Sequence, residues 1–441
     1  MGKEELVHDN STHLHILGLS NGHGEDAIGA QILQAIRQVV QRENYSVTVS
    51  ALPLVGEGNA YERADIPCIS AVRSRPPSGG FLYMDPRQLW RDLQGGLIGV
   101  TLRQWQLVKH WTQDIQRAGG QPFVLAAGDI VPLLFAWRSQ SPYGFVGTAK
   151  SEYYLRDSDG NFLRSRRMEG WSGSVYLPWE RWLMGRPRCQ AVFPRDRLTA
   201  EILNNFTIPA ADLGNPMMDG FLPALDGDDQ SDFALSTSPS ETEPLRLLIV
   251  PGSRSPEAYN NWTQLIELAT AIVNDQPHRA IALEGAIATG LEIDQLAQLL
   301  PNSWQPKENQ SDGRYSWCWG NASLNITVGQ FYQQALDTHL GLAMAGTATE
   351  QLVGLGRPVI TLAGQGPQFT PAFAEAQTRL LGPSIFLAED TKDGVDKVRS
   401  LLQNPQQWSA IARNGRDRLG VPGAANRIAK HLLKNIHSCA L

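Results

Sequence analysis

The chain has 441 residues, more than one ordinary domain holds, and this length suggests two or three domains. Hydrophobic residues make up 42% and charged residues 19%, which is typical of globular rather than disordered proteins. The formal net charge of −6 gives no overall attraction for phosphate backbones, so no nucleic-acid partner is expected.

The sequence has no clear pattern for a zinc site, a disulfide framework, a secretory signal or a membrane-spanning helix. The four cysteines lie far apart, without the C-x-x-C spacing of zinc sites or the density of a disulfide framework. The first residues carry acidic side chains and lack the apolar run of a secretory signal. No apolar stretch reaches the roughly 18 residues that a membrane-spanning helix needs. We expect a cytoplasmic protein that contacts a membrane, if at all, peripherally on its cytoplasmic face.

The first half of the chain predicts strands that alternate with helices. An apolar strand at 13–20 leads through a polar loop at 20–26 into a helix from about 27 to 40. Further strands are predicted at 45–54 and 123–127. This succession favours a parallel sheet with crossover helices.

The same rhythm restarts after an interruption. The segment 223–244 is acidic and rich in Ser and Pro, and predicts an exposed linker. Beyond it the pattern predicts strands at 245–250, 279–284, 340–344 and 359–362, and helices at 262–273 and 347–355. We therefore expect an N-terminal acceptor- or membrane-facing domain at 1–222, a C-terminal nucleotide-binding domain at 245–420, and a helix at 421–441 that packs back on the first domain.

The segment Met344–Glu350 is the leading candidate for binding a diphosphate. Gly346 permits close approach of the backbone, and the first turn of the following helix offers N–H groups that favour an anion. Hydroxyls of Thr347 and Thr349 would add donors. A capping box, with Thr347 as N-cap and Glu350 at N3, explains the same residues without a ligand. Both interpretations stay open at this point.

A second turn of this kind follows the strand at 245–250. Gly252 and Ser253 permit close backbone approach, and Arg254 can neutralise a leaving diphosphate with two hydrogen bonds. The alternative is an ordinary turn with a surface arginine. Two such turns in one domain favour binding.

Acidic residues follow two predicted strands of the first domain. His23, Glu25 and Asp26 lie at the carboxyl end of the first strand, where open α/β sheets bind ligands, and any of them could take a proton from an acceptor hydroxyl. The alternative is that Asp26 caps the next helix and Glu25 complements its dipole. Asp129 directly follows a buried-type strand and is a further catalytic candidate, with a helix cap as its alternative.

No metal or bound cofactor is expected. Asp157-Ser158-Asp159 matches a metal-binding D-x-D pattern, but its polar surroundings are typical of a hairpin turn, and we reject it as a metal site. The glycine-rich pieces complete neither a dinucleotide fingerprint nor a P-loop.

Arginines and tryptophans gather in two parts of the first domain. They include Trp90, Arg91 and Trp105 in the first part and Trp179 and Trp182 in the second. Together they suit an anionic bilayer interface. The alternative is that the tryptophans pack in the core and the arginines form a solvated face.

Taken in order, the motifs resemble the lipid A disaccharide synthase family, peripheral-membrane glycosyltransferases of the GT-B fold, and within it a divergent branch of cyanobacterial type. The resemblance runs from about Leu14 to Leu387. It rests on Asp26–Ala30, Gly128-Asp129, Leu213–Asp219, Val250–Arg254, Gly346-Thr347-Ala348 and Gly356-Arg357-Pro358.

The resemblance implies an α/β, GT-B architecture of two Rossmann-like domains that face each other across a cleft. It implies inverting transfer of a sugar from a UDP-sugar to a lipid or lipid-linked acceptor, without a metal. Asp129 matches the family's essential aspartate and Asp26 the acidic residue of its first loop. The nucleotide contacts match Arg254 and Gly346-Thr347, with Ala348 beside them.

The chain departs from the family pattern at three places. Gln351 stands where many GT-B enzymes have a glutamate that grips the ribose, and Glu350 lies one position early. Pro371-Ala372 replaces a Pro-Asn pair. The Gly-His-Gly of the first loop is closer to the peptidoglycan N-acetylglucosaminyltransferase and the galactolipid synthases. Two alternatives therefore remain: a UDP-sugar epimerase on the same fold, and a non-catalytic lipid-binding relative.

Overall fold

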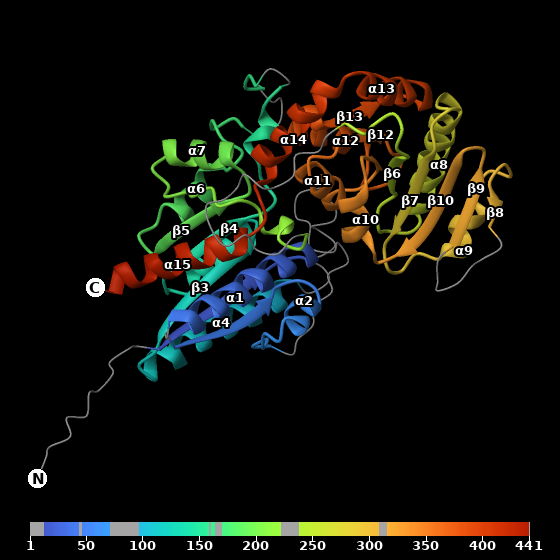
Figure 1. The fold of residues 1–441 in the computed structure, drawn as a ribbon. Coiled ribbons are helices and arrows are strands. Elements are labelled where there is room, and N and C mark those ends of the chain that lie inside the picture. Colours follow the sequence, from blue (N-terminus) through green and yellow to red (C-terminus); the bar gives the residue numbers. More distant parts are fainter. Residues whose placement is uncertain are drawn as a thin grey trace, which may run out of the picture. The chain divides into compact units, whose positions relative to one another are not determined.

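The computed structural model describes residues 13–43, 46–70, 97–157, 160–163, 170–221, 238–307 and 315–440. Its chain divides into two compact units, which Figure 1 colours along the sequence. Unit 1 comprises Met1–Glu152, Arg164–Met217 and Gly423–Leu441, and unit 2 comprises Tyr153–Leu163 and Met218–Pro422.

Unit 1 is built on a five-stranded parallel sheet in the order β2-β1-β3-β4-β5. Its strands are nearly continuous apolar runs, because both faces of a parallel sheet are covered by helices. The strands are β1 (Leu14–Ser20), β2 (Val47–Pro53), β3 (Gln121–Gly128), β4 (Tyr143–Gly147) and β5 (Cys189–Pro194).

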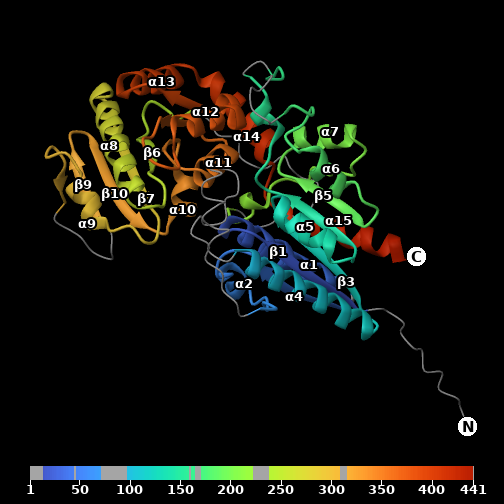
Figure 2. The ribbon, with the colours of Figure 1, turned by 180° about the vertical axis from the view of Figure 1, so that it is seen from behind.

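Two helical layers cover this sheet. On one face lie α1 (His23–Glu43) and α15 (Ala424–Ala440), side by side (Figure 1). Figure 2 shows the other face, covered by α4 (Leu97–Arg117), α5 (Ile130–Arg138) and α6 (Pro178–Met184). The shorter helices of the unit are α2 (Asn59–Arg63) and α7 (Arg197–Asn205). Two 3-10 turns, η1 (Glu152–Leu155) and η2 (Pro216–Met218), begin in unit 1 and end in unit 2.

The helix α15 is part of the core of unit 1. Its buried residues Ile428, Leu432 and Leu433 join the apolar cluster formed by α1 and the sheet. A Cβ added to Gly144 of β4 would lie 3.1 Å from a methyl carbon of Leu432, so the helix packs directly on the strand.

Unit 2 contains an eight-stranded sheet in the order β13-β12-β11-β6-β7-β10-β9-β8. All pairings are parallel except those of β9 with β10 and with β8. The strands are β6 (Leu245–Val250), β7 (Ile281–Ile287), β8 (Gln305–Pro306), β9 (Tyr315–Trp319), β10 (Ala322–Val328), β11 (Leu340–Ala343), β12 (Val359–Leu362) and β13 (Ile385–Ala388).

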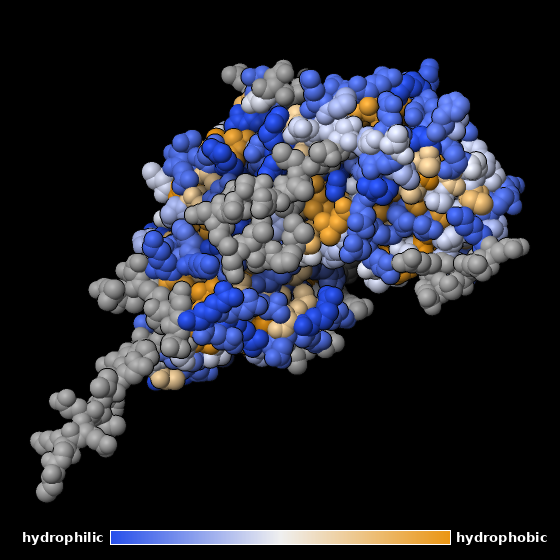
Figure 3. All heavy atoms as spheres, viewed as in Figure 1, coloured by the Kyte–Doolittle hydropathy of each residue, from blue (hydrophilic) through white to orange (hydrophobic). Residues whose placement is uncertain are grey.

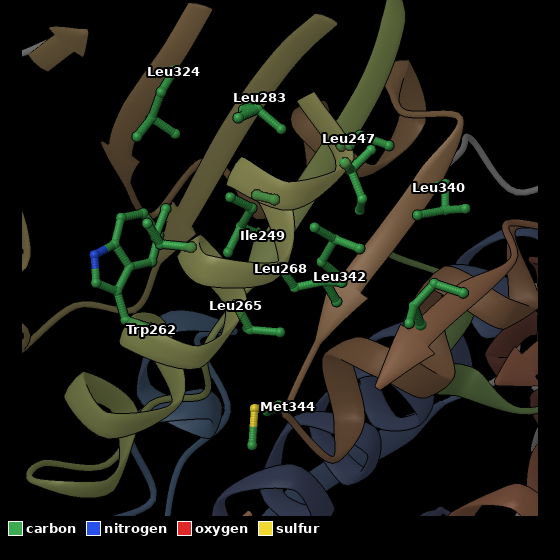
Figure 4. Close-up of a cluster of buried hydrophobic side chains, with 14 of the residues drawn as sticks. Leu247, Ile249, Trp262, Leu265, Leu268, Leu283, Leu324, Leu340, Leu342 and Met344 are labelled. Atoms are coloured by element: carbon green, nitrogen blue, oxygen red, sulfur yellow. The ribbon is translucent and has the colours of Figure 1, made fainter. Parts of the chain in front are cut away.

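Helix α8 buries its apolar face on the centre of this sheet. Figure 4 shows Trp262, Leu265 and Leu268 beside strand residues such as Leu283 and Leu342. The helices of the unit are α8 (Glu257–Asp275), α9 (Ile293–Gln298), α10 (Phe331–Asp337), α11 (Thr347–Gly354), α12 (Pro371–Leu381), α13 (Thr391–Gln403) and α14 (Pro405–Leu419), with a 3-10 turn η4 (Gly382–Ser384).

The predicted first domain, 1–222, differs from unit 1 in two respects. Unit 2 begins already at Met218, and residues 153–163 belong to unit 2 because they contact its helices. The guanidinium of Arg418 lies 3.5 Å from the centre of the Tyr153 ring, and Arg379 donates a hydrogen bond to the Tyr154 carbonyl. Most of the predicted linker lies outside the described residues, which resume at 238.

Two helices begin earlier than predicted. Helix α1 starts at His23 rather than near 27, because the Gly22 carbonyl accepts a hydrogen bond from the Asp26 N–H at 2.8 Å and closes the first turn. Helix α8 starts at Glu257 rather than at 262. Polar residues in its first turns hide the start, and one of them, Asn261, is buried.

Within the described ranges, no helix is both long and apolar enough to cross a bilayer. On the face drawn in Figure 3, hydrophilic residues predominate and apolar residues form small separate patches.

We expect Leu432→Ala to destabilise unit 1 by about 2–5 kcal/mol, because it leaves a cavity between α15 and the sheet. The loss of stability would be measured by chemical denaturation, monitored through hydrogen exchange of the backbone amides of β1 and β3. The exposed Lys430→Ala on the same helix is the control. Equal stability of both variants would show that α15 is not part of this core.

Candidate functional site

The two glycine turns of unit 2 lie side by side. The chain runs from β6 to β7 on one side and later returns to β11 on the other side of β6. In this pairing Ala343 lies opposite Val250, so both strands end at the same level. Open α/β sheets bind ligands outside the carboxyl ends of strands at such a reversal of strand order. The turns 251–256 and 344–346 form this edge.

Gly252 is required by its conformation and by its neighbour. Its φ of 99° lies in the region that favours glycine, and a Cβ added there would lie 3.2 Å from the Met344 carbonyl oxygen. The two turns therefore touch through backbone. Ser253 and Arg254 follow on the exposed part of the turn.

The N-terminus of α11 carries no side-chain cap among the described residues. Gly346 is the N-cap, with φ −83° and ψ −91°, and Thr347 is the first residue of the helix. The predicted capping box is therefore wrong: Thr347 lies one position too late to cap, and Glu350 is not at N3. The first-turn N–H groups of Thr347 and Ala348 have no acceptor within the helix, which favours an anion at this end.

Glu350 and Gln351 occupy the second turn of α11. Glu350 is half-buried and Gln351 is buried, with its backbone carbonyl bonded to the Leu355 N–H. Of the two, Glu350 is the more accessible to a ligand.

Glu257 is a contributor to this edge that the sequence analysis missed. Its buried carboxylate accepts hydrogen bonds from the backbone N–H groups of Phe369 at 2.6 Å and Gln368 at 3.3 Å. It thereby holds the turn after β12 against α8, beside the first two turns. An acidic residue at the start of a helix is normally explained by the helix dipole alone. The sequence therefore gives no signal that Glu257 also bonds the turn after β12.

In unit 1 the catalytic candidates also lie at a reversal of strand order. The strands β1 and β3 are adjacent, with Ser20 opposite Ala127, and β2 lies on the other side of β1. The structure therefore brings the turn that carries His23 and Asp26 next to Asp129.

Asp26 does not cap α1, and that interpretation is wrong. The residue lies inside the first turn, and its Oδ1 accepts a hydrogen bond of 2.6 Å from the Ser20 hydroxyl. Ser20 also contacts the buried Tyr61 hydroxyl at 2.7 Å. Asp26 is only 1% exposed, so its carboxyl is not accessible to an acceptor. His23, in contrast, is exposed.

The Asp26 carboxyl loses its proton at a higher pH than an ordinary aspartate. Burial raises its pKa to about 6, the Ser20 hydrogen bond and the nearby His23 lower it, and Glu25 raises it. Among the described residues, its Oδ2 has no hydrogen-bond partner. A Cβ added to Gly56 would lie 3.9 Å from this Oδ2 and 3.8 Å from His23 Nδ1. The imidazole and the carboxyl therefore both lie next to Gly56.

Asp129 has the role of a helix cap, and its catalytic role stays a prediction. It is the N-cap of α5, and its Oδ1 accepts a hydrogen bond of 2.8 Å from the Val131 N–H. Burial raises its pKa, which the Val131 bond lowers, Glu25 raises and a hydrogen bond from Asn21 lowers. A carboxyl at a strand end whose pKa is raised above its usual value is a candidate for proton transfer.

The tryptophans differ in exposure. Trp105 is half-buried, with the Arg138 guanidinium 4.5 Å from its ring centre, so it lies between the two interpretations. Trp179 and Trp182 on α6 are 46% and 50% exposed, so that alternative is wrong for them. Trp90 and Arg91 lie outside the described residues.

The D-x-D segment behaves as a turn where it is described. The Asp157 side chain accepts a hydrogen bond of 2.8 Å from the Asn161 N–H, and Arg156 pairs with Phe162 across the hairpin. Ser158 and Asp159 lie outside the described residues. Elsewhere in the described ranges, no group of three His, Cys, Asp or Glu side chains is arranged to hold a metal ion.

No protein-family model matches the chain, and a search of curated proteins finds no match either. Solved structures, in contrast, match it over nearly its whole length. The UDP-GlcNAc 2-epimerase from Neisseria meningitidis, solved with UDP-GlcNAc, is 15% identical, with a TM-score of 0.52 over 95% of this chain and 100% of that one.

A solved glycosyltransferase and MurG match equally well. The calicheamicin glycosyltransferase CalG4 is 15% identical, with a TM-score of 0.57 over 97% of this chain and 100% of its own. MurG from Acinetobacter baumannii is 13% identical, with a TM-score of 0.51 over 95% and 99%. At these identities the likeness shows the fold. The chain has the GT-B fold of two Rossmann-like domains, which confirms the predicted fold class. The narrower resemblance to lipid A disaccharide synthases stays a prediction.

We expect Asp26→Asn to stabilise unit 1 increasingly as the pH rises. The folded wild type keeps the Asp26 proton up to a pKa of about 6, whereas the unfolded chain loses it near 3.8. Wild-type stability therefore falls between these values, by about 3 kcal/mol in total, and stays lower above them. Asparagine lacks this charge.

Denaturant unfolding at pH 4 and pH 8 would measure the effect. The difference between Asp26→Asn and wild type should shift in favour of the variant at pH 8. The control is Asp65→Asn, whose side chain is exposed. A difference independent of pH would contradict the assignment.

Proposed function

We propose that the chain is a glycosyltransferase that moves a sugar from a UDP-sugar to a lipid or lipid-linked acceptor with inversion. The observation that carries the proposal is the uncapped N-terminus of α11 beside the backbone turn at Gly252. Together with Arg254, this edge offers N–H donors and a guanidinium to a diphosphate. The neighbouring structures include enzymes named for UDP-GlcNAc and one solved with UDP, which supports uridine diphosphate as the carrier.

The donor chemistry follows from these groups. Arg254 and the N–H groups at Gly346 and Thr347 would bind the diphosphate and stabilise the negative charge that grows on it as the sugar leaves. These groups supply positive potential from the chain itself. We expect no metal or bound cofactor to be needed.

The acceptor chemistry belongs to unit 1. Asp129 or His23 would take the proton of the acceptor hydroxyl as it attacks the sugar on the face opposite the leaving UDP. Asp26 is buried and would act on His23 through its field rather than touch the acceptor. In this division, Asp129 or His23 is the catalytic group of unit 1, and Asp26 is a positioning group.

A UDP-sugar epimerase is the second candidate, favoured by the several structural neighbours named UDP-GlcNAc 2-epimerase. Its reaction needs no acceptor. A non-catalytic lipid-binding relative is the third, and the departures at Gln351 and Ala372 support it.

We expect the protein to bind UDP, and Arg254→Ala to weaken this binding about 10–100-fold, the effect of losing hydrogen bonds to a charged group. Isothermal titration calorimetry measures both. The exposed Arg413→Ala on α14 is the matched control and should bind UDP like the wild type. Absence of UDP binding in the wild type would refute the nucleotide assignment.

Turnover separates the enzymatic candidates. A transferase consumes UDP-sugar only when an acceptor lipid is added, and Asp129→Asn should lower this rate at least about 100-fold, a typical general-base contribution. Product analysis by mass spectrometry and NMR is the measurement. Epimerised UDP-sugar formed without acceptor would favour the second candidate, and full cellular function of Asp129→Asn would favour the third.

A lipid acceptor implies peripheral contact with the cytoplasmic membrane face. The exposed Trp179 and Trp182, with the Arg186 guanidinium 4.5 Å from the Trp182 ring centre, suit an anionic interface. We expect the double change of both tryptophans to serine to reduce flotation with phosphatidylglycerol vesicles several-fold. The exposed Tyr332→Ser in unit 2 should not. Equal flotation of all three proteins would exclude this surface.

A further inference from the structure

Two buried amide side chains lie behind the glycine turns of unit 2. Asn261 comes from α8 and Gln377 from α12, and both are at most 2% exposed. Each donates its hydrogen bonds to backbone carbonyls of the turns rather than to other side chains. Neither residue belongs to a motif that the sequence analysis singled out.

Gln377 holds two successive carbonyls. Its Nε2 donates to the Ala345 carbonyl at 3.0 Å and to the Gly346 carbonyl at 3.4 Å. The Ala345 carbonyl also accepts the Thr349 hydroxyl at 2.7 Å, so it is fixed from two directions. Among the described residues, the remaining polar atom of Gln377, its Oε1, has no partner.

Asn261 bonds two further backbone carbonyls, one from each turn. Its Nδ2 donates to the Pro251 carbonyl at 3.0 Å and to the Met344 carbonyl at 3.4 Å. One side chain thereby joins the turn after β6 to the turn after β11.

The direction of these carbonyls sets the direction of the N–H groups that follow them. In a planar trans peptide, the C=O of one residue and the N–H of the next point in opposite directions. A carbonyl drawn inward to Gln377 therefore turns the N–H of Gly346 or Thr347 away from α12. By the same geometry, Asn261 turns the N–H groups of Gly252 and Ala345 away from α8.

We infer that Asn261 and Gln377 are positioning residues that aim four backbone N–H groups, those of Gly252, Ala345, Gly346 and Thr347, at the diphosphate of the bound nucleotide. The inference rests on the proposed function and names how its site is built. Three of the four groups are consecutive, so one short segment would supply most of the donors.

The electrostatic effect has two parts. An N–H aimed at a phosphate oxygen attracts it, and a carbonyl turned toward the same oxygen would repel it. The amides provide the first and prevent the second without contacting the nucleotide. Their loss should therefore weaken binding of the diphosphate while the nucleoside still binds.

The test compares UDP, uridine and inorganic pyrophosphate as ligands. Gln377→Leu removes the donor at similar size, and Gln377→Glu replaces it with carboxylate oxygens at the same shape. Calorimetry measures UDP and pyrophosphate, and saturation-transfer NMR measures uridine. We expect each variant to lose at least about tenfold in affinity for UDP and pyrophosphate, the effect of about 1.4 kcal/mol. Uridine binding should not change. Asn261→Leu should behave like Gln377→Leu.

The matched control is Asn414→Leu. Asn414 also donates to a backbone carbonyl, that of Leu381, but at the other end of α12, so it should leave all three affinities unchanged. If Gln377→Leu fails to fold, Gln377→Glu carries the test, because it keeps the shape of the side chain.

The outcomes distinguish failure of the proposed function from failure of the positioning role. If the wild type binds none of the three ligands, the proposed function fails. If the wild type binds UDP and Gln377→Glu binds it equally well, only the positioning role fails. Equal losses for UDP and uridine would point to a general packing role and also overturn the inference.

Discussion

The register between β6 and β11 is the constraint on which the candidate site of unit 2 depends. Ala343 lies opposite Val250, so the two strands end at the same level and release their turns side by side. The core holds this register: Leu342 and Met344 are buried with Trp262 in the cluster under α8 (Figure 4). A slip of one residue would turn these side chains out of the core and separate the turns.

The two units have the same kind of sheet edge, but the groups at that edge carry opposite charge or polarity. At the reversal of strand order, unit 2 presents backbone N–H groups and an arginine, which suit a leaving anion. At the same place, unit 1 presents buried carboxyls, and burial raises the pKa of both Asp26 and Asp129. The fold supplies the same edge in both units, and the residues that follow each strand decide whether it carries hydrogen-bond donors or carboxyls.

Much of the fold could be predicted from the sequence, because buried parallel strands are apolar runs that need no partner to be recognised. The start of α8 could not, because Asn261 interrupts the apolar pattern, and only the structure shows that its amide bonds two turns. The segment 153–163 is a similar case. Its place in unit 2 depends on Arg379 and Arg418, more than 200 residues away along the chain.

The choice between cap and ligand at Thr347 could not be made from sequence either. A capping box needs Thr347 just before the helix, and the backbone of Gly346 takes that position instead. Likewise, Asp26 has the composition of a cap but bonds to Ser20. In these two cases a shift of one and of four residues in the helix start decides the role, and local patterns do not determine helix ends so closely.

Helix α15 has a consequence for how the chain is made. The core of unit 1 includes Ile428, Leu432 and Leu433, but all of unit 2 beyond its short first segment is synthesised between β5 and this helix. On the ribosome, the strands of unit 1 and α1 must wait with an uncovered apolar face while the second unit emerges and folds. Unit 1 is first in sequence and last to be completed, so the nascent chain needs protection from aggregation during that interval.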